Sequence, residues 1–286
     1  MPSVAVVIPV RDRAAMLVEA LASVLAQTYR DFGIVVVDDG SSDGSAAAAE
    51  DVLAGVAVPG RVLRQQPRGV AAARNAGVAQ LDARWIAFLD SDDLWMPRKL
   101  ERQIAWLEAH PDYRVAQTDE RWIDAGRHRN PRRRHRKEEQ LFLRSLGCCL
   151  VSPSAVVIAR ELFAACGGFD ETFPVCEDYE LWLRITIREL VGLVPEALVV
   201  KRGGHPDQLS RSTWGLDRWR VAALLKLLAR PDLGAHERAA AAAVVREKCD
   251  ILAGGARRRG RDDEATRYGE LAAAAGAMAM PLAVPA

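Results

Sequence analysis

The feature of this sequence that most constrains its fold is an alternation, over the first 120 residues, of short apolar runs with segments of helical periodicity. The runs Val4–Ile8, Ile34–Val37 and Trp85–Leu89 have the length and composition of buried strands. Strands that alternate with helices are typical of βαβ units around a parallel sheet. The sequence therefore predicts an α/β fold with a mostly parallel, Rossmann-like central sheet flanked by helices.

Further segments extend this pattern along the chain. Asp12 is expected to cap a helix at 14–25. Pro97 is expected to begin another helix that continues to residue 109, because its missing N–H is harmless at the first helical position. The region from Trp214 onward is Ala-rich and helical by pattern, with a frayed end at 278–286. The other expected strands are 62–63, 114–118, 155–158 and 191–200, and the other helices are 45–54, 69–81 and 178–190.

The charges of the 286-residue chain nearly cancel, with 39 Lys and Arg against 38 Asp and Glu. Binding nucleic acid over a broad surface needs an excess of cations, so no nucleic-acid partner is expected. No segment approaches the roughly 18 to 20 uninterrupted apolar residues of a membrane helix. The apolar N-terminus also lacks the preceding basic region of a signal peptide. We therefore expect a cytoplasmic protein whose charged functions are local.

The cysteines give no sign of a metal or redox site. There are five of them, an odd number, and they include no CxxC pair. In a chain without an export signal, this pattern favours reduced structural thiols. They are Cys148, Cys149, Cys166, Cys176 and Cys249.

Two acidic clusters follow predicted strands. Asp38 and Asp39 come after the run at 34–37, and Asp90, Asp92 and Asp93 come after the run at 85–89. Asp is common in turns, but the carboxyl ends of parallel strands meet at one edge of a sheet, where ligands bind. Carboxylates crowded together favour a bound cation, and oxygen ligands suit Mg²⁺ or Mn²⁺. The clusters therefore predict a divalent ion that shares its shell with a nucleotide diphosphate.

The common nucleotide-binding motifs are absent. The sequence has no GxxxxGK[ST] motif, and no GxGxxG follows the first predicted strand. P-loop hydrolysis and dinucleotide-dependent hydride transfer are therefore disfavoured.

Five motifs, in order, resemble those of family 2 glycosyltransferases. They include VVDDGSSD at 36–43, ARNAG at 73–77, FLDSDD at 88–93 and CEDYELWLR at 176–184, and the first is the strand at 4–9. The resemblance implies the GT-A fold and transfer of a sugar from a nucleotide diphosphate with inversion at the anomeric carbon. On this basis residues 1–212 form the catalytic domain, divided into a nucleotide-binding half (1–120) and an acceptor-binding half (121–212). Residues 213–286 form a helical C-terminal extension.

The resemblance assigns the nucleotide to the first half. Asp39, with Asp38 beside it, is implied to contact the base, since a carboxylate accepts from a ring N–H. Arg74 is either a contact to a phosphate or base edge or a helix-surface arginine. The full set of implied nucleotide contacts is Pro9, Arg11, Asp38, Asp39, Arg74, Asp90 and Ser91.

The segment Asp90-Ser91-Asp92 matches the family's DxD motif. By resemblance Asp92 ligates Mn²⁺ or Mg²⁺, Asp90 binds the ribose or assists at the metal, and Asp93 is an alternative ligand. His205 is implied to approach the metal or diphosphate, with an ordinary loop histidine as the alternative. The ion's expected role is to stabilise the leaving diphosphate.

Inversion requires a base that takes the proton of the acceptor hydroxyl. Asp178 has the family's position for this base, and Glu177 beside it would orient the acceptor or support Asp178. A helix N-terminus keeps a carboxylate ionised, although a simple helix cap explains Asp178 as well. Trp95 is either part of the acceptor floor, where sugars stack on aromatic faces, or a core tryptophan.

The segment 127–137, RHRNPRRRHRK, carries seven Lys and Arg residues, two His and no acid. Its composition predicts a mobile, solvated loop. Such cations also attract an anionic acceptor, for example a lipid-linked diphosphate at the inner membrane surface, with about 1 kcal/mol for each cation. Peripheral contact with that membrane through 127–137 is therefore an expectation.

These features predict a metal-dependent, inverting glycosyltransferase that uses a UDP-, dTDP- or GDP-sugar. The acceptor is expected to be a hydroxyl group of a glycan or lipid-linked molecule in cell-surface polysaccharide synthesis. Two alternatives remain open. A nucleotidyltransferase shares the sheet and acidic metal site but releases pyrophosphate, and a non-catalytic nucleotide- or glycan-binding protein keeps the fold without needing a base.

Overall fold

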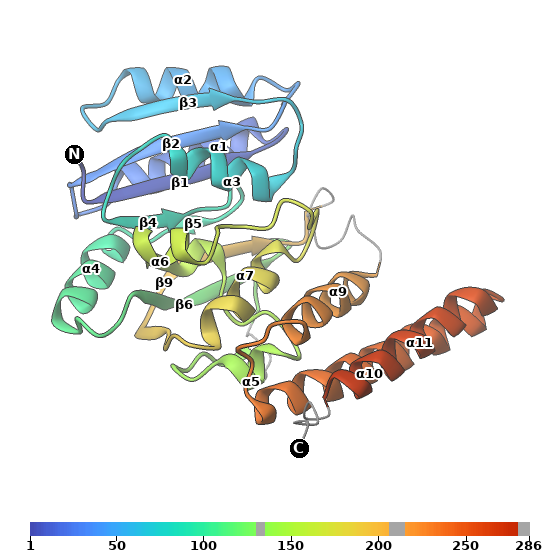
Figure 1. Ribbon diagram of the computed structural model, residues 1–286. Helices are drawn as coiled ribbons and strands as arrows, with labels where there is room; N and C mark the ends of the chain where they lie inside the picture. The colour runs from blue at the N-terminus through green and yellow to red at the C-terminus, as the bar shows by residue number, and fades with distance from the viewer. Residues whose placement is uncertain (130–134, 206–214, 280–286) are drawn as a thin grey trace.

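The computed structural model describes residues 1–129, 135–205 and 215–279 (Figure 1). Its strands are β1 (Val4–Val10), β2 (Phe32–Asp38), β3 (Gly60–Arg64), β4 (Trp85–Phe88), β5 (Leu94–Trp95), β6 (Val115–Asp124), β7 (Arg127–Arg129), β8 (Val156–Ala159) and β9 (Gly192–Gly203). Within the described residues these nine strands form one sheet in the order β3-β2-β1-β4-β8-β6-β9-β5, with β7 paired to β6.

Most of these strands run in the same direction. β1 pairs in parallel with β2 and β4, and β2 pairs in parallel with β3. β8 lies antiparallel between β4 and β6, so β6 and its parallel neighbour β9 run in the direction of β4. The carboxyl ends of β1, β2 and β4 therefore open at one edge of the sheet, as the sequence predicts.

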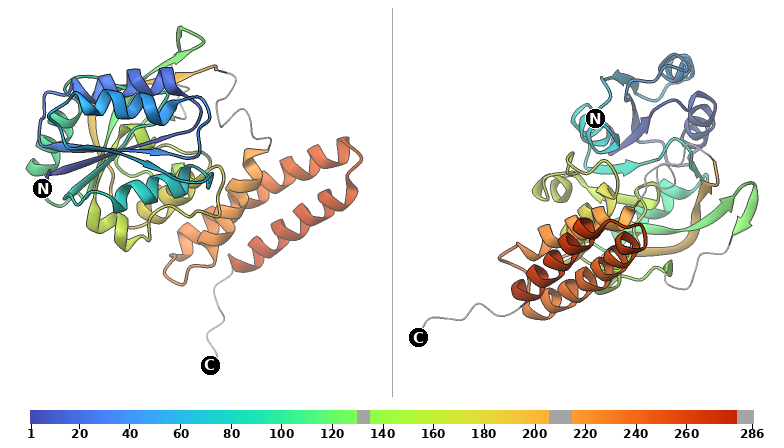
Figure 2. Two further views of the ribbon diagram at one scale, coloured as in Figure 1. Left: turned by 90° about the horizontal axis from the view of Figure 1, so that it is seen from above. Right: turned by 90° about the vertical axis from the view of Figure 1, so that its right-hand side faces the viewer.

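Helices cover both faces of the sheet (Figure 2). α1 (Ala14–Leu25) and α2 (Ser45–Ala54) lie on one face, and α3 (Val70–Ala79) and α6 (Arg160–Ala165) lie on the other. α4 (Lys99–Ala109) packs against β6 and β9. Because helices enclose β1 and β2 on both faces, every residue of these two strands is buried, which explains their near-continuous apolar sequence.

The C-terminal region consists of α9 (Leu216–Leu228), α10 (Ala235–Arg258) and α11 (Asp262–Met278). α10 and α11 pack side by side as a helical hairpin that extends from the sheet domain (Figure 1). α9 packs against α7 (Glu177–Thr186), and α10 touches the short helix α5 (Phe142–Ser145). A second core, which includes Tyr179, Leu183, Leu224 and Val245, joins these helices. The extension is therefore anchored to the helix that carries Asp178.

The order and type of the predicted elements are confirmed, and most differences are at their ends. β6 continues to Asp124, beyond the predicted strand at 114–118, and α7 ends at Thr186 rather than at 190. α4 begins at Lys99, two residues after Pro97. α11 includes Met278, and residues 280–286 of the expected frayed end lie outside the described residues.

The predicted cap of α1 by Asp12 is wrong. Asp12 has a positive φ of 50°, and its carboxylate accepts the backbone N–H of Ser42 at 2.7 Å. The first-turn N–H of Ala14 is instead bound by the Asp43 carboxylate at 2.8 Å, from the loop after β2. A side chain distant in the sequence therefore accepts the N–H at the start of α1, in place of a cap from the residue next to the helix.

The prediction of a solvated loop at 127–137 is wrong in part: residues 127–129 are exposed but form a strand, and Lys137 is buried. Residues 127–129 form β7, which pairs with β6 as a hairpin. The Lys137 side chain is only 7% exposed and lies 3.4 Å from the buried Glu120 carboxylate, and its Nζ donates to the carbonyl of Thr118. Residues 130–134 lie outside the described part of the chain. None of the described helices is both long and apolar enough to span a membrane.

Candidate active site

A cavity of about 670 Å³ opens at the carboxyl ends of β1 and β4. The N-terminus of α7 and the first turns of α9 also line it. Ten residues singled out from the sequence line it together, namely Pro9, Arg11, Asp39, Arg74, Asp90, Ser91, Asp92, Asp93, Glu177 and Asp178. The fold therefore gathers motifs that are far apart in the sequence around one space.

Asp90, Asp92 and Asp93 follow β4 and can offer carboxylate oxygens within 4.8 Å of one another. Asp92 Oδ2 contacts Arg13 Nη1 at 2.8 Å and His205 Nε2 at 2.9 Å. His205, which is predicted to approach the metal or diphosphate, thus contacts a residue of this cluster, and residues 206–214, which follow it, lie outside the described chain.

The three carboxylates have different surroundings. Both oxygens of Asp93 accept hydrogen bonds, one from Ser154 Oγ at 2.7 Å and one from the backbone N–H of Arg202 at 3.0 Å. Burial, together with the charge of Asp92, raises the pKa of Asp93 well above its usual range. Burial also acts to raise the pKa of Asp90, but the guanidinium of Arg74 outweighs it and the pKa is lowered.

The donor set fits a hard divalent cation. Among the described residues, the side-chain contacts to these two carboxylates are made at Asp90 Oδ1 and at Asp92 Oδ2. Within this part of the chain the other oxygens, Asp90 Oδ2 and Asp92 Oδ1, are left for a ligand. Carboxylate oxygens within 4.8 Å of one another suit Mg²⁺ or Mn²⁺, which commonly complete their coordination with water and phosphate oxygens. Asp93, with both oxygens bound to protein donors, fits better as the residue that fixes the loop.

Arg74 links the acidic cluster to α7. Its side chain is 4% exposed, with Nη2 2.7 Å from Asp90 Oδ1 and Nη1 2.6 Å from Glu177 Oε1. The guanidinium also lies over the Phe169 ring, 5.0 Å from its centroid. Burial and the charge of Asp178 raise the pKa of Glu177 to about 7, because they outweigh the neighbouring Arg74. Arg74 is thus a buried residue that joins two carboxylates, and not a helix-surface arginine.

Asp178 lies in the first turn of α7. The residue before the helix, Cys176, has φ 62° and ψ 20°, a left-handed conformation that costs about 1–3 kcal/mol for a residue other than glycine. Asp178 Oδ1 accepts the N–H of Tyr179 at 2.7 Å, and Oδ2 lies 3.5 Å from the Cys149 thiol, which donates to it. The Tyr179 hydroxyl donates to the carbonyl of Leu146 at 2.7 Å. These contacts fix the carboxylate at the cavity wall.

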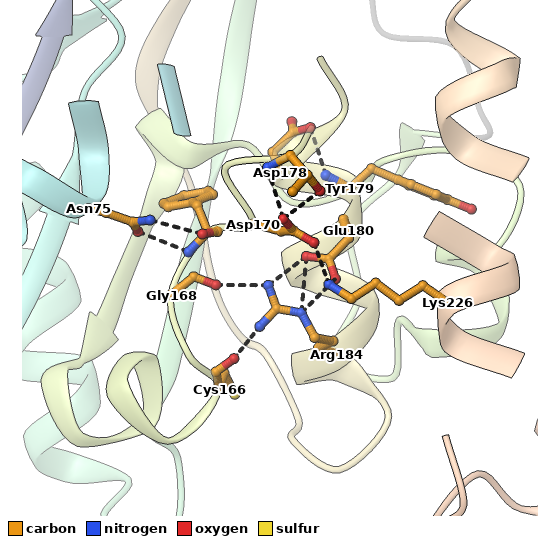
Figure 3. Close-up of polar contacts among 11 residues, drawn as sticks. Asn75, Cys166, Gly168, Asp170, Asp178, Tyr179, Glu180, Arg184 and Lys226 are labelled. Atoms are coloured by element: carbon orange, nitrogen blue, oxygen red, sulfur yellow. Dashed lines mark hydrogen bonds and ion pairs between the residues drawn. The ribbon is translucent and has the colours of Figure 1, made fainter. Parts of the chain in front are cut away.

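A polar cluster behind α7 holds the helix in place (Figure 3). Arg184 pairs with Glu180 one turn earlier and donates to the carbonyls of Cys166 and Gly168. Lys226 of α9 reaches the same Glu180 carboxylate at 2.6 Å. The loop after α6 and the extension therefore both brace the helix that carries Asp178.

Three of the predicted residues are held by protein partners at or near the cavity. The Asp39 carboxylate accepts the backbone N–H groups of Arg68 at 2.7 Å and Gly69 at 2.8 Å, and so shapes the loop before α3. Asp38 accepts the N–H of Ser41 at 3.2 Å and is not among the cavity-lining residues. Trp95 is 3% exposed, its indole N–H donates to the carbonyl of Ser154, and it belongs to the core rather than to the cavity wall.

Lys201, Arg13 and Arg202 line the cavity but are not singled out by the sequence motifs. Lys201 Nζ donates to Ser152 Oγ at 3.0 Å. Burial opposes its charge, but Glu120 and the Asp93 and Asp90 carboxylates outweigh burial and raise the pKa of Lys201. The sequence feature that could have identified these cations is their position. Lys201 and Arg202 lie near the end of β9, and Arg13 follows β1, at the edge of the sheet where the acidic clusters lie.

Comparison with known sequences identifies one protein family. The glycosyl transferase family 2 model matches residues 5–167. An uncharacterized glycosyltransferase of Rickettsia prowazekii is 33% identical over 195 residues, which are 64% of this chain and 58% of that protein. The O-antigen biosynthesis protein RfbC of Myxococcus xanthus is 32% identical over 80% of this chain but only 18% of its own length. The chain thus spans little more than half of the Rickettsia prowazekii relative, and 31% of another from Rickettsia bellii.

Solved structures share the fold. TarS of S. aureus in complex with UDP-GlcNAc has a TM-score of 0.70 at 16% identity, covering 93% of this chain and 90% of that chain. The mannosyltransferase PcManGT from Pyrobaculum calidifontis, in complex with GDP-Man and Mn²⁺, has a TM-score of 0.60 at 19% identity, covering 96% of this chain and 86% of that chain. Together with the family match over more than half of the sequence, these similarities show that the chain belongs to glycosyltransferase family 2 and has the GT-A fold.

Proposed function

We propose that this chain transfers a sugar from a UDP-, dTDP- or GDP-sugar to an acceptor hydroxyl, with inversion at the anomeric carbon and with Mn²⁺ or Mg²⁺ as cofactor. The observation that carries the proposal is that Asp178 and the Asp90–Asp92 pair line the same cavity, linked through Arg74 and Glu177. A cation site and a base facing one space are what displacement of a nucleotide diphosphate by a hydroxyl requires.

The donor is proposed to bind along the β1, β2 and β4 edge. Asp39, Pro9 and Arg11 line the cavity where a base would lie, and Asp90 and Ser91 lie where the ribose and diphosphate follow. Two fold neighbours support this class of donor, since one is bound to UDP-GlcNAc and the other to GDP-Man and Mn²⁺. Asp38 and Trp95 are left out of the proposed contacts because neither lines the cavity.

The metal is proposed to be held by Asp90 and Asp92, with His205 and Arg13 orienting Asp92. A divalent cation there would neutralise the charge that develops on the departing diphosphate. Lys201 adds a fixed positive charge on the same side of the cavity.

Asp178 is proposed to accept the proton of the attacking hydroxyl. The N-terminus of α7 favours the ionised form of a carboxylate, as a base requires. Glu177, buried against Arg74, is proposed to support the position of Asp178 rather than to exchange the reacting proton itself.

The division of the chain follows from this assignment. Residues 1–120 supply the donor contacts, 121–212 the base and part of the acceptor side, and 213–286 the helical extension. A cell-surface glycan or lipid-linked acceptor is proposed on the match to the O-antigen biosynthesis protein. The exposed residues Arg127, His128 and Arg129 of β7 are proposed to contact an anionic membrane surface.

The proposal is tested by incubating the full chain with Mn²⁺ and a panel of UDP-, dTDP- and GDP-sugars, and measuring release of the nucleotide diphosphate. Release from one nucleotide class, with an inverted product anomer by NMR, is expected. Release of pyrophosphate from an NTP would instead identify a nucleotidyltransferase. Tight binding of UDP or GDP without metal dependence, hydrolysis or transfer would identify a non-catalytic binding protein.

A further inference from the structure

Helix α9 contributes to the cavity although it lies outside the residues that match the family. Leu216 and Arg220, in its first turns, line the cavity, whereas the match covers residues 5–167. These two side chains belong to the C-terminal helices and are not among the motifs that resemble the family.

Arg220 carries positive charge that its protein partners do not fully balance. Its Nη1 lies 3.0 Å from Asp217 Oδ1, and the same carboxylate oxygen is 3.0 Å from Lys248 Nζ. One acidic group therefore serves two cations. Among the described residues, Arg220 Nε is buried and has no hydrogen-bond partner. The Arg220 side chain as a whole is 26% exposed and lines the cavity, so a ligand in the cavity can reach it.

Arg220 lies in the part of the cavity lining that α7 and α9 supply, together with Asp178. Cys176 is within electrostatic reach of both Asp178 and Arg220, and Tyr179 also acts on Arg220. The charges that act on Asp90 and Asp93 come instead from Arg74, Arg13 and Lys201. Arg220 is thus not one of the cations that chiefly act on Asp90 and Asp93.

We infer that Arg220 and Leu216 form an acceptor subsite for an anionic group, a phosphate or a carboxylate, close to the hydroxyl that reacts at Asp178. The inference rests on the proposed function. A guanidinium binds both kinds of oxyanion through paired N–H donors, and Leu216 supplies apolar surface beside it. The acceptor class is therefore a glycan or polyol that carries negative charge next to its reacting hydroxyl.

The first test is binding of inorganic phosphate to the full chain saturated with Mg²⁺ and with UDP or GDP, whichever binds, so that the diphosphate site is filled. Calorimetry compares wild type, Arg220→Gln and the control Arg218→Gln, which changes an exposed arginine of α9 outside the cavity lining. Arg220→Gln is expected to weaken phosphate binding about tenfold or more, and Arg218→Gln to leave it within about twofold. Acetate in place of phosphate tests whether a carboxylate binds equally.

A second test separates loss of the subsite from loss of the fold. Arg220→Gln is expected to bind UDP or GDP as tightly as the wild type does, since Arg220 is not among the proposed donor contacts. Arg220→Lys, which keeps the charge but not the paired donors, is expected to recover part of the phosphate affinity.

Two results would overturn the subsite. One is equal phosphate affinity in wild type and Arg220→Gln, and the other is no phosphate binding to the loaded wild type. Absence of both nucleotide binding and donor turnover in the wild type would instead count against the proposed function.

Discussion

The guanidinium of Arg74 lies 2.6 Å from the carboxylate of Glu177, a residue 103 positions further along the chain. The same guanidinium holds Asp90 at 2.7 Å, so one buried side chain ties the end of β4 to the start of α7. The distance between the proposed metal ligands and the proposed base depends on this link.

Replacing Arg74 should damage both stability and activity. Arg74→Ala leaves Asp90 and Glu177 without their shared cation, and loss of one partner of a buried pair costs about 3–5 kcal/mol. The control Arg102→Ala removes an exposed pair with Glu196 and should cost less than about 1 kcal/mol. Urea unfolding of both variants measures the difference, and equal losses would contradict a structural role for the Arg74 link.

Stability should fall as pH rises through the titration of Glu177. Because burial raises the pKa of Glu177 to about 7 from an ordinary 4.5, the folded state binds more protons than the unfolded state between these values. The free energy of unfolding should therefore decrease between pH 4.5 and 7 by up to about 1 kcal/mol per pH unit relative to Glu177→Gln. Denaturation of both proteins at several pH values checks this, and parallel pH profiles would rule out the shift.

Activity should depend on a divalent cation. Chelation with EDTA should lower donor turnover by about a hundredfold or more, and Mn²⁺ or Mg²⁺ should restore it. His205→Ala should weaken the metal about tenfold, because it removes a contact that orients Asp92. His110→Ala, next to α4 and stacked on Trp106, is the matched histidine control and should leave metal affinity unchanged. Full activity in EDTA would contradict metal dependence.

Two glycines should respond to alanine with opposite signs. A Cβ at Gly77 would lie 2.4 Å from Val7 Cγ1, so Gly77→Ala should push α3 away from β1 and cost about 1–3 kcal/mol. A Cβ at Gly269 in α11 would meet nothing within 4 Å beyond the helix's own backbone, so Gly269→Ala should stabilise the chain by about 0.5–1 kcal/mol. Thermal unfolding of the two variants checks the close contact of α3 with the sheet.

The fold and the gathering of the acidic motifs could be predicted because they depend on local patterns. The runs at β1, β2 and β4 are apolar over most of their length, and parallel strands place the residues after them at one edge. The positions of Asp39 and Asp90 at that edge follow from this pattern alone. Their roles, and the role and place of Asp178, come from the resemblance to the family.

Other features depend on contacts between distant segments, which local patterns do not indicate. The burial of Arg74 requires Glu177 and Phe169 to fold against α3, and nothing near Arg74 in the sequence indicates this. The basic neighbours of Lys137 predict a place in solvent, yet it pairs with Glu120 of β6 inside the protein. Arg220 joins the cavity only through the packing of α9 on α7.

The most direct test of the proposed chemistry is the transfer rate of Asp178→Asn, measured beside its affinity for the donor nucleotide. If Asp178 is the base, kcat should fall by about a thousandfold or more, while nucleotide affinity stays within about threefold because Asp178 is not among the proposed donor contacts. A kcat equal to that of the wild type would contradict the assignment of Asp178 as the base.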